Sequence, residues 1–278
     1  MSNRRALAQL DCFEGAYIKV RPLSNLESSL RTQPLHISIA IDGTVSDSDC
    51  KRAFQLLHEL RSIDELVVWV TTDAVPETVR GNESVKTLSV IVKNRNADVA
   101  DLIRSCPKCS SLLLFLLAEG SFDDDLWNSI IGLKLLREFR LDYGRSSISY
   151  EQLCMLEKLP VEHLQFRNVK LDQRWPEAIS SCKELKSLSV EADLEACHSP
   201  IDLSPLLHLR SLNSLKLYGW TSDGKLEKQL KSTGDGASNK VQVFRKGLTI
   251  SENESNKDGV RAYGYNTQTT QKHTKKTE

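Results

Sequence analysis

The stretch Leu102-Ile-Arg-Ser-Cys-Pro-Lys-Cys-Ser-Ser-Leu-Leu-Leu-Phe-Leu116 joins two patterns that follow each other directly. Its second half places leucines at 112, 114 and 116, and side chains two residues apart share one face of a strand. Its first half belongs to a run with helical apolar spacing, 97–106. Pro107 ends that run, because proline has no amide hydrogen with which to continue a helix. The stretch therefore predicts a short helix that leads into a buried strand.

The strand pattern returns along the chain at a regular interval. Each copy has an apolar anchor, usually another apolar residue two positions later, and a further apolar residue three positions earlier. The anchors are Leu66, Leu88, Leu112, Phe139, Leu164, Leu188 and Leu215, which lie 22 to 27 residues apart. A period of roughly 20–30 residues with this phrase is typical of a leucine-rich repeat solenoid. The sequence thus predicts an α/β right-handed horseshoe, with parallel strands on its concave face and helices on its convex face.

The repeat divides the chain into four parts. Residues 35–220 form the predicted solenoid of about seven to eight units, and residues 1–34 form an N-terminal cap over its exposed end. Residues 221–250 are predicted to form a C-terminal cap with an edge strand. The tail, 251–278, has almost no aliphatic residues, so it cannot bury enough apolar surface to offset the entropy of ordering. We expect this tail to be disordered.

Helices are predicted between the strands, where apolar residues follow the helical period. Ser121 precedes the acidic residues 123–125, and Ser204 precedes Pro205. Both patterns are typical of helix starts. A first strand is expected at 35–41, and the predicted helices span 46–61, 97–106, 123–133, 149–159, 175–185 and 205–212.

Two stretches, 102–114 and 179–190, carry a finer pattern. In each, a Cys precedes an apolar anchor by three positions, and the small thiol fits a tight corner between helix and strand. These stretches resemble the cysteine-containing repeats of F-box leucine-rich repeat proteins, which are ribonuclease-inhibitor-like. The resemblance implies a surface that binds another protein and, as an alternative, substrate recognition for a ubiquitin ligase. Two features depart from that family. The Asn that usually follows the strand is missing, and 1–34 is too short for a three-helix F-box.

An open α/β sheet is the alternative fold, because fully buried parallel strands also read as aliphatic runs that alternate with helices. The regular repeat favours the solenoid, and the Gly-rich turn of a dinucleotide-binding enzyme is absent from the sequence. The matching alternative functions are an α/β enzyme, or a regulator such as the GTPase-activating proteins built on helical leucine-rich repeats.

Composition narrows the classes of partner. Lys plus Arg and Asp plus Glu both number 37, so no net charge attracts the chain to nucleic acid or to an anionic membrane. The longest apolar run, 112–118, is too short to span a bilayer. Seven irregularly spaced cysteines without a signal peptide indicate reduced thiols. We therefore expect the protein in the cytoplasm or nucleus and not in the secretory pathway, where the sequons at Asn82 and Asn253 would matter.

No catalytic or metal-binding constellation emerges from the sequence. Cys106 and Cys109 form an isolated Cys-x-x-Cys pair, whereas a structural zinc site needs four ligands. The pair also closes a helix, and a thioredoxin-like pair would open one. We expect buried thiols at a repeat corner, no cofactor, no small-molecule substrate and no enzymatic activity.

The candidate site is the concave face, because residues between the buried anchors point to the open side of the sheet. Its first part is apolar and its second part is polar. The predicted partner-binding residues are Val67, Trp69, Ile91, Leu113, Phe115, Arg140, Asp142, Arg167 and Tyr218, and Gln165, Glu191 and Lys216 share the polar part. An exposed apolar patch beside charges is typical of a protein-binding surface. Two alternatives remain: the N-terminal cap covers these residues, or the strand register differs by one.

Overall fold

The computed structural model describes most of the repeat region. The described residues are 17–22, 35–41, 55, 57, 63–70, 81–92, 98–116, 120–121, 123–143, 146–192, 201–218, 240–245 and 248–249. The predicted tail, most of the predicted caps and most of the predicted helix 46–61 lie outside these residues. Within that helix, Gln55 and Leu57 are helical.

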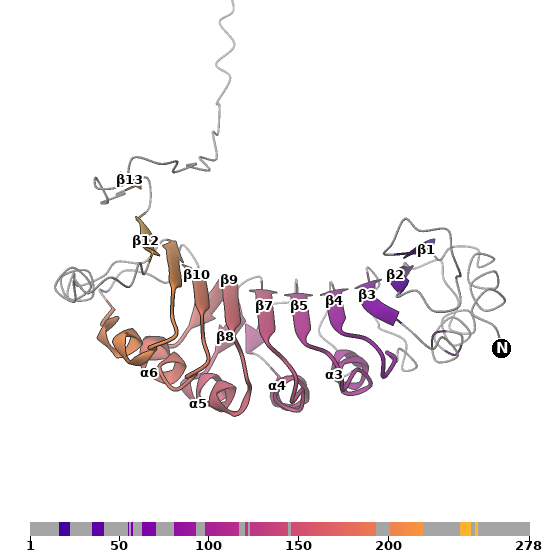
Figure 1. Cartoon of the computed structure of the whole chain (residues 1–278), viewed down its shortest axis with the longest axis horizontal. Helices are drawn as coiled ribbons and strands as arrows, with labels where there is room; N and C mark the ends of the chain where they lie inside the picture. Colours follow the sequence, from indigo (N-terminus) through magenta and orange to yellow (C-terminus); the bar gives the residue numbers. More distant parts are fainter. Residues whose placement is uncertain are drawn as a thin grey trace, which may run out of the picture.

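One curved sheet runs through the described part of the chain (Figure 1). Nine of its described strands are parallel neighbours, in the order β2-β3-β4-β5-β7-β9-β10-β11-β12. They are β2 (Leu35–Ile41), β3 (Ile63–Val70), β4 (Thr87–Val92), β5 (Ser111–Leu116), β7 (Glu138–Tyr143), β9 (His163–Leu171), β10 (Ser187–Ala192), β11 (Ser214–Tyr218) and β12 (Lys240–Arg245).

Short strands complete the sheet. β1 (Tyr17–Pro22) pairs antiparallel with β2, and β13 (Leu248–Thr249) pairs antiparallel with β12. β6 (Gly120–Ser121) pairs with β8 (Ser146–Ile148), which also pairs with the end of β9.

The described helices all lie along one face of the sheet, which is the outer side of the arc (Figure 1). They are α3 (Asp98–Arg104), α4 (Asp124–Ile131), α5 (Tyr150–Cys154), the 3₁₀ helix η1 (Met155–Lys158), α6 (Trp175–Ile179) and the 3₁₀ helix η2 (Ser204–His208). A doubly wound α/β sheet would carry helices on both faces. The described part of the chain is therefore an α/β fold with one mainly parallel sheet and with its described helices on the convex side.

Burial alternates along the strands as the sequence predicts. In β5, Leu112, Leu114 and Leu116 are buried, whereas the residues between them are half-buried. The repeat anchors stand opposite one another in neighbouring strands from Leu66 of β3 to Leu215 of β11. Each fully buried side chain of this type contributes roughly 1.5–3 kcal/mol relative to exposure. The predicted strand register is thus confirmed, and the one-residue slip is excluded for these strands.

The cysteines at the turns from helix to strand are buried, as the sequence predicts. Cys106, Cys109 and Cys182 are buried where the chain turns from helix to strand, and all three are free thiols. Burial raises the pKa of Cys106 to about 11 and the pKa values of Cys109 and Cys182 to about 12. Gly81 packs so closely against this corner that a Cβ there would lie 2.1 Å from the Cys106 sulfur. A buried apolar thiol is protonated and inert.

The helices are shorter than predicted. The segment predicted as 175–185 is helical only to Ile179, and hydrogen bonds of the i→i+3 kind then lead the chain through Cys182 back to the sheet. Likewise 205–212 contains only η2, and 149–159 divides into α5 and η1. The cause is the repeat itself, because each segment must cross the convex side and rejoin the sheet at the next strand.

The helix starts also differ in part from the prediction. Asp123, not Ser121, caps α4, and its side chain accepts a hydrogen bond from the Asp125 amide. Ser204 lies inside η2 and makes no side-chain cap. At the start of α5, for which the sequence suggested no particular cap, Ser149 and Gln152 form a capping box.

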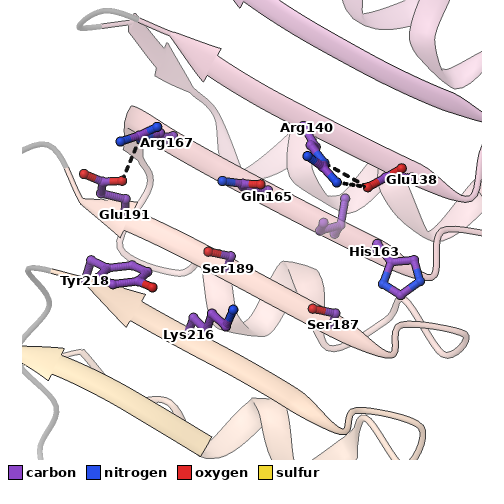
Figure 2. A pocket seen from close by; sticks show the side chains of 11 residues that line it. Glu138, Arg140, His163, Gln165, Arg167, Ser187, Ser189, Glu191, Lys216 and Tyr218 are labelled. Atoms are coloured by element: carbon purple, nitrogen blue, oxygen red, sulfur yellow. Dashed lines mark hydrogen bonds and ion pairs between the residues drawn. The ribbon is translucent and has the colours of Figure 1, made fainter. Parts of the chain in front are cut away.

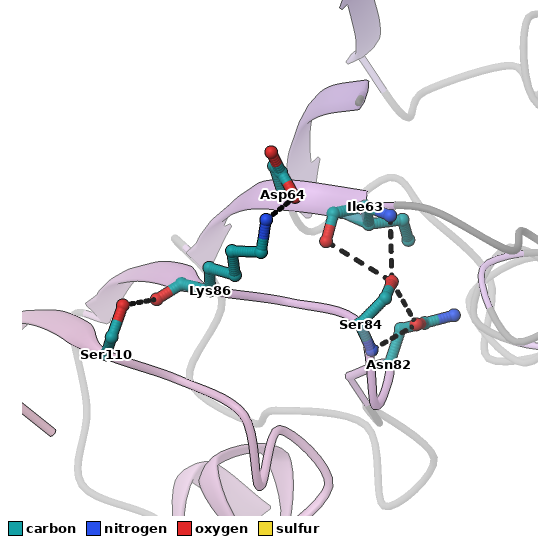
Figure 3. Close-up of polar contacts among 6 residues, drawn as sticks. All are labelled: Ile63, Asp64, Asn82, Ser84, Lys86 and Ser110. Atoms are coloured by element: carbon teal, nitrogen blue, oxygen red, sulfur yellow. Dashed lines mark hydrogen bonds and ion pairs between the residues drawn. The ribbon is translucent and has the colours of Figure 1, made fainter. Parts of the chain in front are cut away.

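A buried asparagine supports the loop before β4 (Figure 3). Asn82 donates from its amide nitrogen to the Leu57 carbonyl at 2.8 Å, and its amide oxygen accepts from the Ser84 amide at 2.8 Å. Ser84 in turn accepts from the Ile63 amide at 2.8 Å. Asn82 thus ties two repeats together from a position that the sequence analysis treated only as a sequon. Its amide is 6% exposed, so the folded chain does not present it for glycosylation.

Candidate functional site

The concave face consists of three rows that run across the strands. The entry row contains His36, Glu65, Thr87, Ser111, Glu138, His163, Ser187 and Ser214. The middle row contains Ser38, Val67, Ser89, Leu113, Arg140, Gln165, Ser189 and Lys216. The exit row contains Trp69, Ile91, Phe115, Asp142 and Arg167, then, past a bulge in β9, Glu191 and Tyr218. Every predicted site residue falls in the middle or exit row.

The rows bring the predicted apolar residues together on β3, β4 and β5. Trp69, Ile91 and Phe115 are in-register neighbours in the exit row, so their backbones are about 4.8 Å apart. Val67 and Leu113 lie beside them in the middle row, with Ser89 between. We call the five apolar residues the apolar patch.

The apolar patch is open to solvent at its tryptophan. Trp69 is 51% exposed, and the other members of the apolar patch are half-buried. The described structure therefore does not support the alternative that an N-terminal cap buries Trp69. Leu135, in the turn between α4 and β7 and off the sheet, is the other large hydrophobic residue exposed to a similar degree among the described residues, at 54%.

The polar part of the face begins at β7 and is crossed by ion pairs. Arg140 donates from Nε to Glu138 at 2.8 Å, and Arg167 donates from Nε to Glu191 at 2.9 Å. Asp142 accepts from the Asn168 amide at 3.0 Å and lies 3.9 Å from Arg167. The predicted Arg140, Asp142 and Arg167 are therefore held by neighbouring charged or polar side chains.

The environment of Glu138 keeps it ionised. Burial raises the pKa of Glu138, but the hydrogen bond from Ser111 and the adjacent Arg140 outweigh burial, so the net pKa lies below its ordinary value. A general acid at neutral pH needs a raised pKa. Glu138 is thus suited to hold Arg140 in place and not to donate a proton.

A hollow of about 600 Å³ lies on the polar part of the face (Figure 2). Its floor is low along β10 because Ser187 and Ser189 are small, whereas the neighbouring strands carry longer side chains. The hollow is lined by Glu138, Arg140, His163, Leu164, Gln165, Arg167, Ser187, Ser189, Glu191, Lys216 and Tyr218. The Arg167–Glu191 pair closes one end, and His163 stands at the other (Figure 2).

The entry row and its preceding residues were missed by the sequence analysis. Glu162 precedes β9 and pairs with Arg137 on one side and with Lys186, at 2.5 Å, on the other. The hydrogen bond from Lys186, together with Arg137, lowers the pKa of Glu162. One ion network thus links three successive repeats. The sequence contains the signal for this network, because the entry-row residues and the residues that precede them stand one and two positions before each repeat anchor.

The described residues offer neither a metal centre nor a membrane span. No group of three His, Cys, Asp or Glu side chains among them is placed to hold a metal ion. None of the helices in the described ranges is long and apolar enough to cross a membrane.

Comparison with known proteins adds little to this geometry. No family model matches the chain, and no curated protein matches it. Among solved structures, the chain is similar to a chain in the structure of the Drosophila Toll–Spatzle complex, with 14% identity and a TM-score of 0.37. The match covers 78% of this chain and 36% of that chain, so this chain spans well under half of its length.

Proposed function

We propose that the chain is a leucine-rich repeat solenoid that binds a partner protein on its concave face and has no catalytic role of its own. Three observations support the solenoid: the regular spacing of the anchors, their stacking in register from β3 to β11, and the position of the described helices on one side of the sheet.

The apolar patch is the observation that carries the binding proposal. Half-exposed tryptophan beside aliphatic and aromatic neighbours is costly to leave in water, and such patches mark protein interaction sites. Aromatic residues that sit centrally in an interface, with polar residues around them, tend to contribute most of its binding energy. The row of charged residues that begins at β7 supplies this polar rim.

The non-catalytic part of the proposal rests on the polar side chains that face the hollow. Both arginines there are paired with carboxylates, and Glu138 is held in its charged form. These pairs suit a rigid recognition surface. Ser187 and His163 are register neighbours in the hollow, but no hydrogen bond joins their side chains among the described contacts, whereas covalent catalysis needs a nucleophile bonded to its base.

We also propose a reducing compartment, the cytoplasm or nucleus, as the site of action. Cys106, Cys109, Cys154 and Cys182 are free cysteines, and the first two lie close together at one corner without forming a disulfide. Buried reduced thiols of this kind are typical of intracellular proteins. Fractionation of cells that express a tagged chain tests this part independently.

The binding proposal is tested by affinity capture with two matched variants. Trp69→Ala removes the exposed tryptophan of the apolar patch, and Leu135→Ala removes an equally exposed hydrophobic residue that lies off the sheet. We expect partners recovered with the unaltered chain to be lost with Trp69→Ala and kept with Leu135→Ala, while circular dichroism shows both variants folded. Loss with both variants, or with neither, contradicts a site on the concave face.

A further inference from the structure

We propose, building on the function above, that the partner presents an extended segment with an apolar side chain on the apolar patch and an Asp or Glu side chain in the hollow, paired with Lys216. The two groups are separated by about four to six residues along the segment. This assigns the hollow to one carboxylate and gives the partner a recognisable sequence pattern.

The charges around the hollow call for one negative group. Glu138 pairs with Arg140, and both Glu191 and Asp142 pair with Arg167, so the two arginines that line the hollow already have acidic partners. Lys216 is exposed, and no carboxylate among the described side chains pairs with it. On its other side, Lys216 stands in register with Gln242 of β12, a strand whose sequence KVQVFR contains no acidic residue. Among the described side chains, Lys216 is therefore a cation of the hollow that has no acidic partner.

The single positive charge of Lys216 favours a carboxylate over a phosphate as the group that binds there. A phosphorylated side chain carries close to two negative charges at neutral pH and is usually held by several cations. Here both guanidinium groups already bond to glutamates, and Lys216 is the remaining lysine or arginine that lines the hollow. A single carboxylate matches it, and the hydroxyls of Ser187 and Ser189 line the floor as further donors.

The position of the floor explains how a side chain reaches Lys216. Ser187 and Ser189 leave a low strip along β10, with Gln165 of β9 on one side and Lys216 of β11 on the other (Figure 2). A carboxylate in this strip lies beside the Lys216 ammonium and the two serine hydroxyls, which together can bond to its oxygens. The cost of desolvating the lysine is small because its side chain stays exposed.

Strand spacing sets the separation of the two groups. From Phe115 on β5 to the floor on β10 there are three strand intervals, or about 14 Å at about 4.8 Å each. From Ile91 on β4 there are four, or about 19 Å. An extended chain advances about 3.3 Å per residue, so about four to six residues separate the partner's apolar side chain from its acidic side chain. The segment must cross the strands, because β4 to β11 are already paired on both sides and cannot accept an added strand.

The test is a selection of random twelve-residue peptides displayed on phage, with the full chain as bait. Three baits are compared: the unaltered chain, Lys216→Glu and, as a matched control, Lys183→Glu. Lys183 is exposed in the turn after α6, away from the concave face. We expect the unaltered chain and Lys183→Glu to enrich an apolar residue followed or preceded, four to six positions away, by Asp or Glu. Lys216→Glu should no longer enrich the acid.

A selected peptide then serves as a defined probe in fluorescence anisotropy. Replacing its acid by Ala, or changing Lys216 to Glu, should weaken binding about tenfold or more, because a charge-assisted contact is lost. Phosphoserine in place of the acid should bind no more tightly than the carboxylate. Tighter binding of the phosphoserine peptide by tenfold, or enrichment of acids that survives Lys216→Glu, overturns the assignment.

The outcomes separate this inference from the proposed function. Peptides that lose binding with Trp69→Ala but carry no acid at the expected spacing leave the apolar patch as the site and refute the role of Lys216. Peptides whose binding is unchanged by Trp69→Ala and by Lys216→Glu refute a binding site on the concave face. If no peptide is enriched over a surface without bait, recognition of an extended segment is refuted. The proposal that the concave face binds a partner protein is then still tested by affinity capture with Trp69→Ala and Leu135→Ala.

Discussion

Leu113 and Leu114 are identical side chains on opposite faces of β5, and their truncation should lower the free energy of unfolding by very different amounts. Leu114 is fully buried and stands between Val90 of β4 and Leu141 of β7. Leu114→Ala removes three carbon atoms, which costs about 2.4 kcal/mol at about 0.8 kcal/mol for each buried methylene. The cavity left in a close-packed core adds to this, so we expect a loss of about 3–4 kcal/mol in the free energy of unfolding.

Leu113→Ala is the matched control, because Leu113 is half-buried and faces the open side. Its truncation should cost about 1 kcal/mol or less. Urea titration followed by far-ultraviolet circular dichroism measures both losses, and similar slopes for the two variants validate the comparison. Equal losses, or a larger loss for Leu113→Ala, would refute the strand register and with it the placement of the whole concave face.

Four further predictions concern the backbone and the cysteines. Gly81→Ala should lower the free energy of unfolding by about 1–3 kcal/mol in thermal denaturation, since its Cβ would overlap the Cys106 sulfur, and Cys106→Ala should restore part of that loss. Asn168 has a φ of 54° at the bulge in β9, so Asn168→Ala should cost about 1–2 kcal/mol in the same assay, and an unchanged midpoint would argue against this left-handed conformation. Cys106 and Cys109 should resist thiol reagents at pH 8 in the folded chain and react on unfolding. Burial raises the pKa values of these two thiols above the ordinary value of 9.0, so the folded state favours their protonated form. The stability that this contributes is complete below about pH 9 and declines as the pH rises toward 11–12. Denaturant titrations across that pH range measure the decline.

The sequence predicted the sheet well because period-two burial leaves a direct signal. Leu112 and Leu114 fall on the buried face and Phe115 on the open face, as the alternation requires. The register between strands followed from the same signal, since shifting β3, for example, by one residue would bury Trp69 and expose Val68. The predicted apolar patch therefore lies where the spacing placed it.

Features that depend on neighbouring repeats were harder to predict. The hollow exists because Ser187 and Ser189 lie between strands with longer side chains, and a pattern along one strand does not reveal this. The pairing of Arg167 with Glu191 likewise joins two neighbouring strands, β9 and β10, and a pattern along either strand alone does not reveal it. Helix lengths were overestimated because apolar periodicity continues into the i→i+3 turns that lead back to the sheet.

The most direct test of the account is to ask which surface touches the partner. A photoreactive amino acid replaces Ser89, which lies within the apolar patch between Val67 and Leu113, or Lys183 on the outer turn after α6. Irradiation of cells that express each chain, followed by purification, should give a covalent partner adduct from position 89 and none from position 183. The adduct from position 89 should also disappear when Trp69→Ala is added. An adduct that forms from position 183 and not from position 89 would place the binding surface on the convex side and contradict the account.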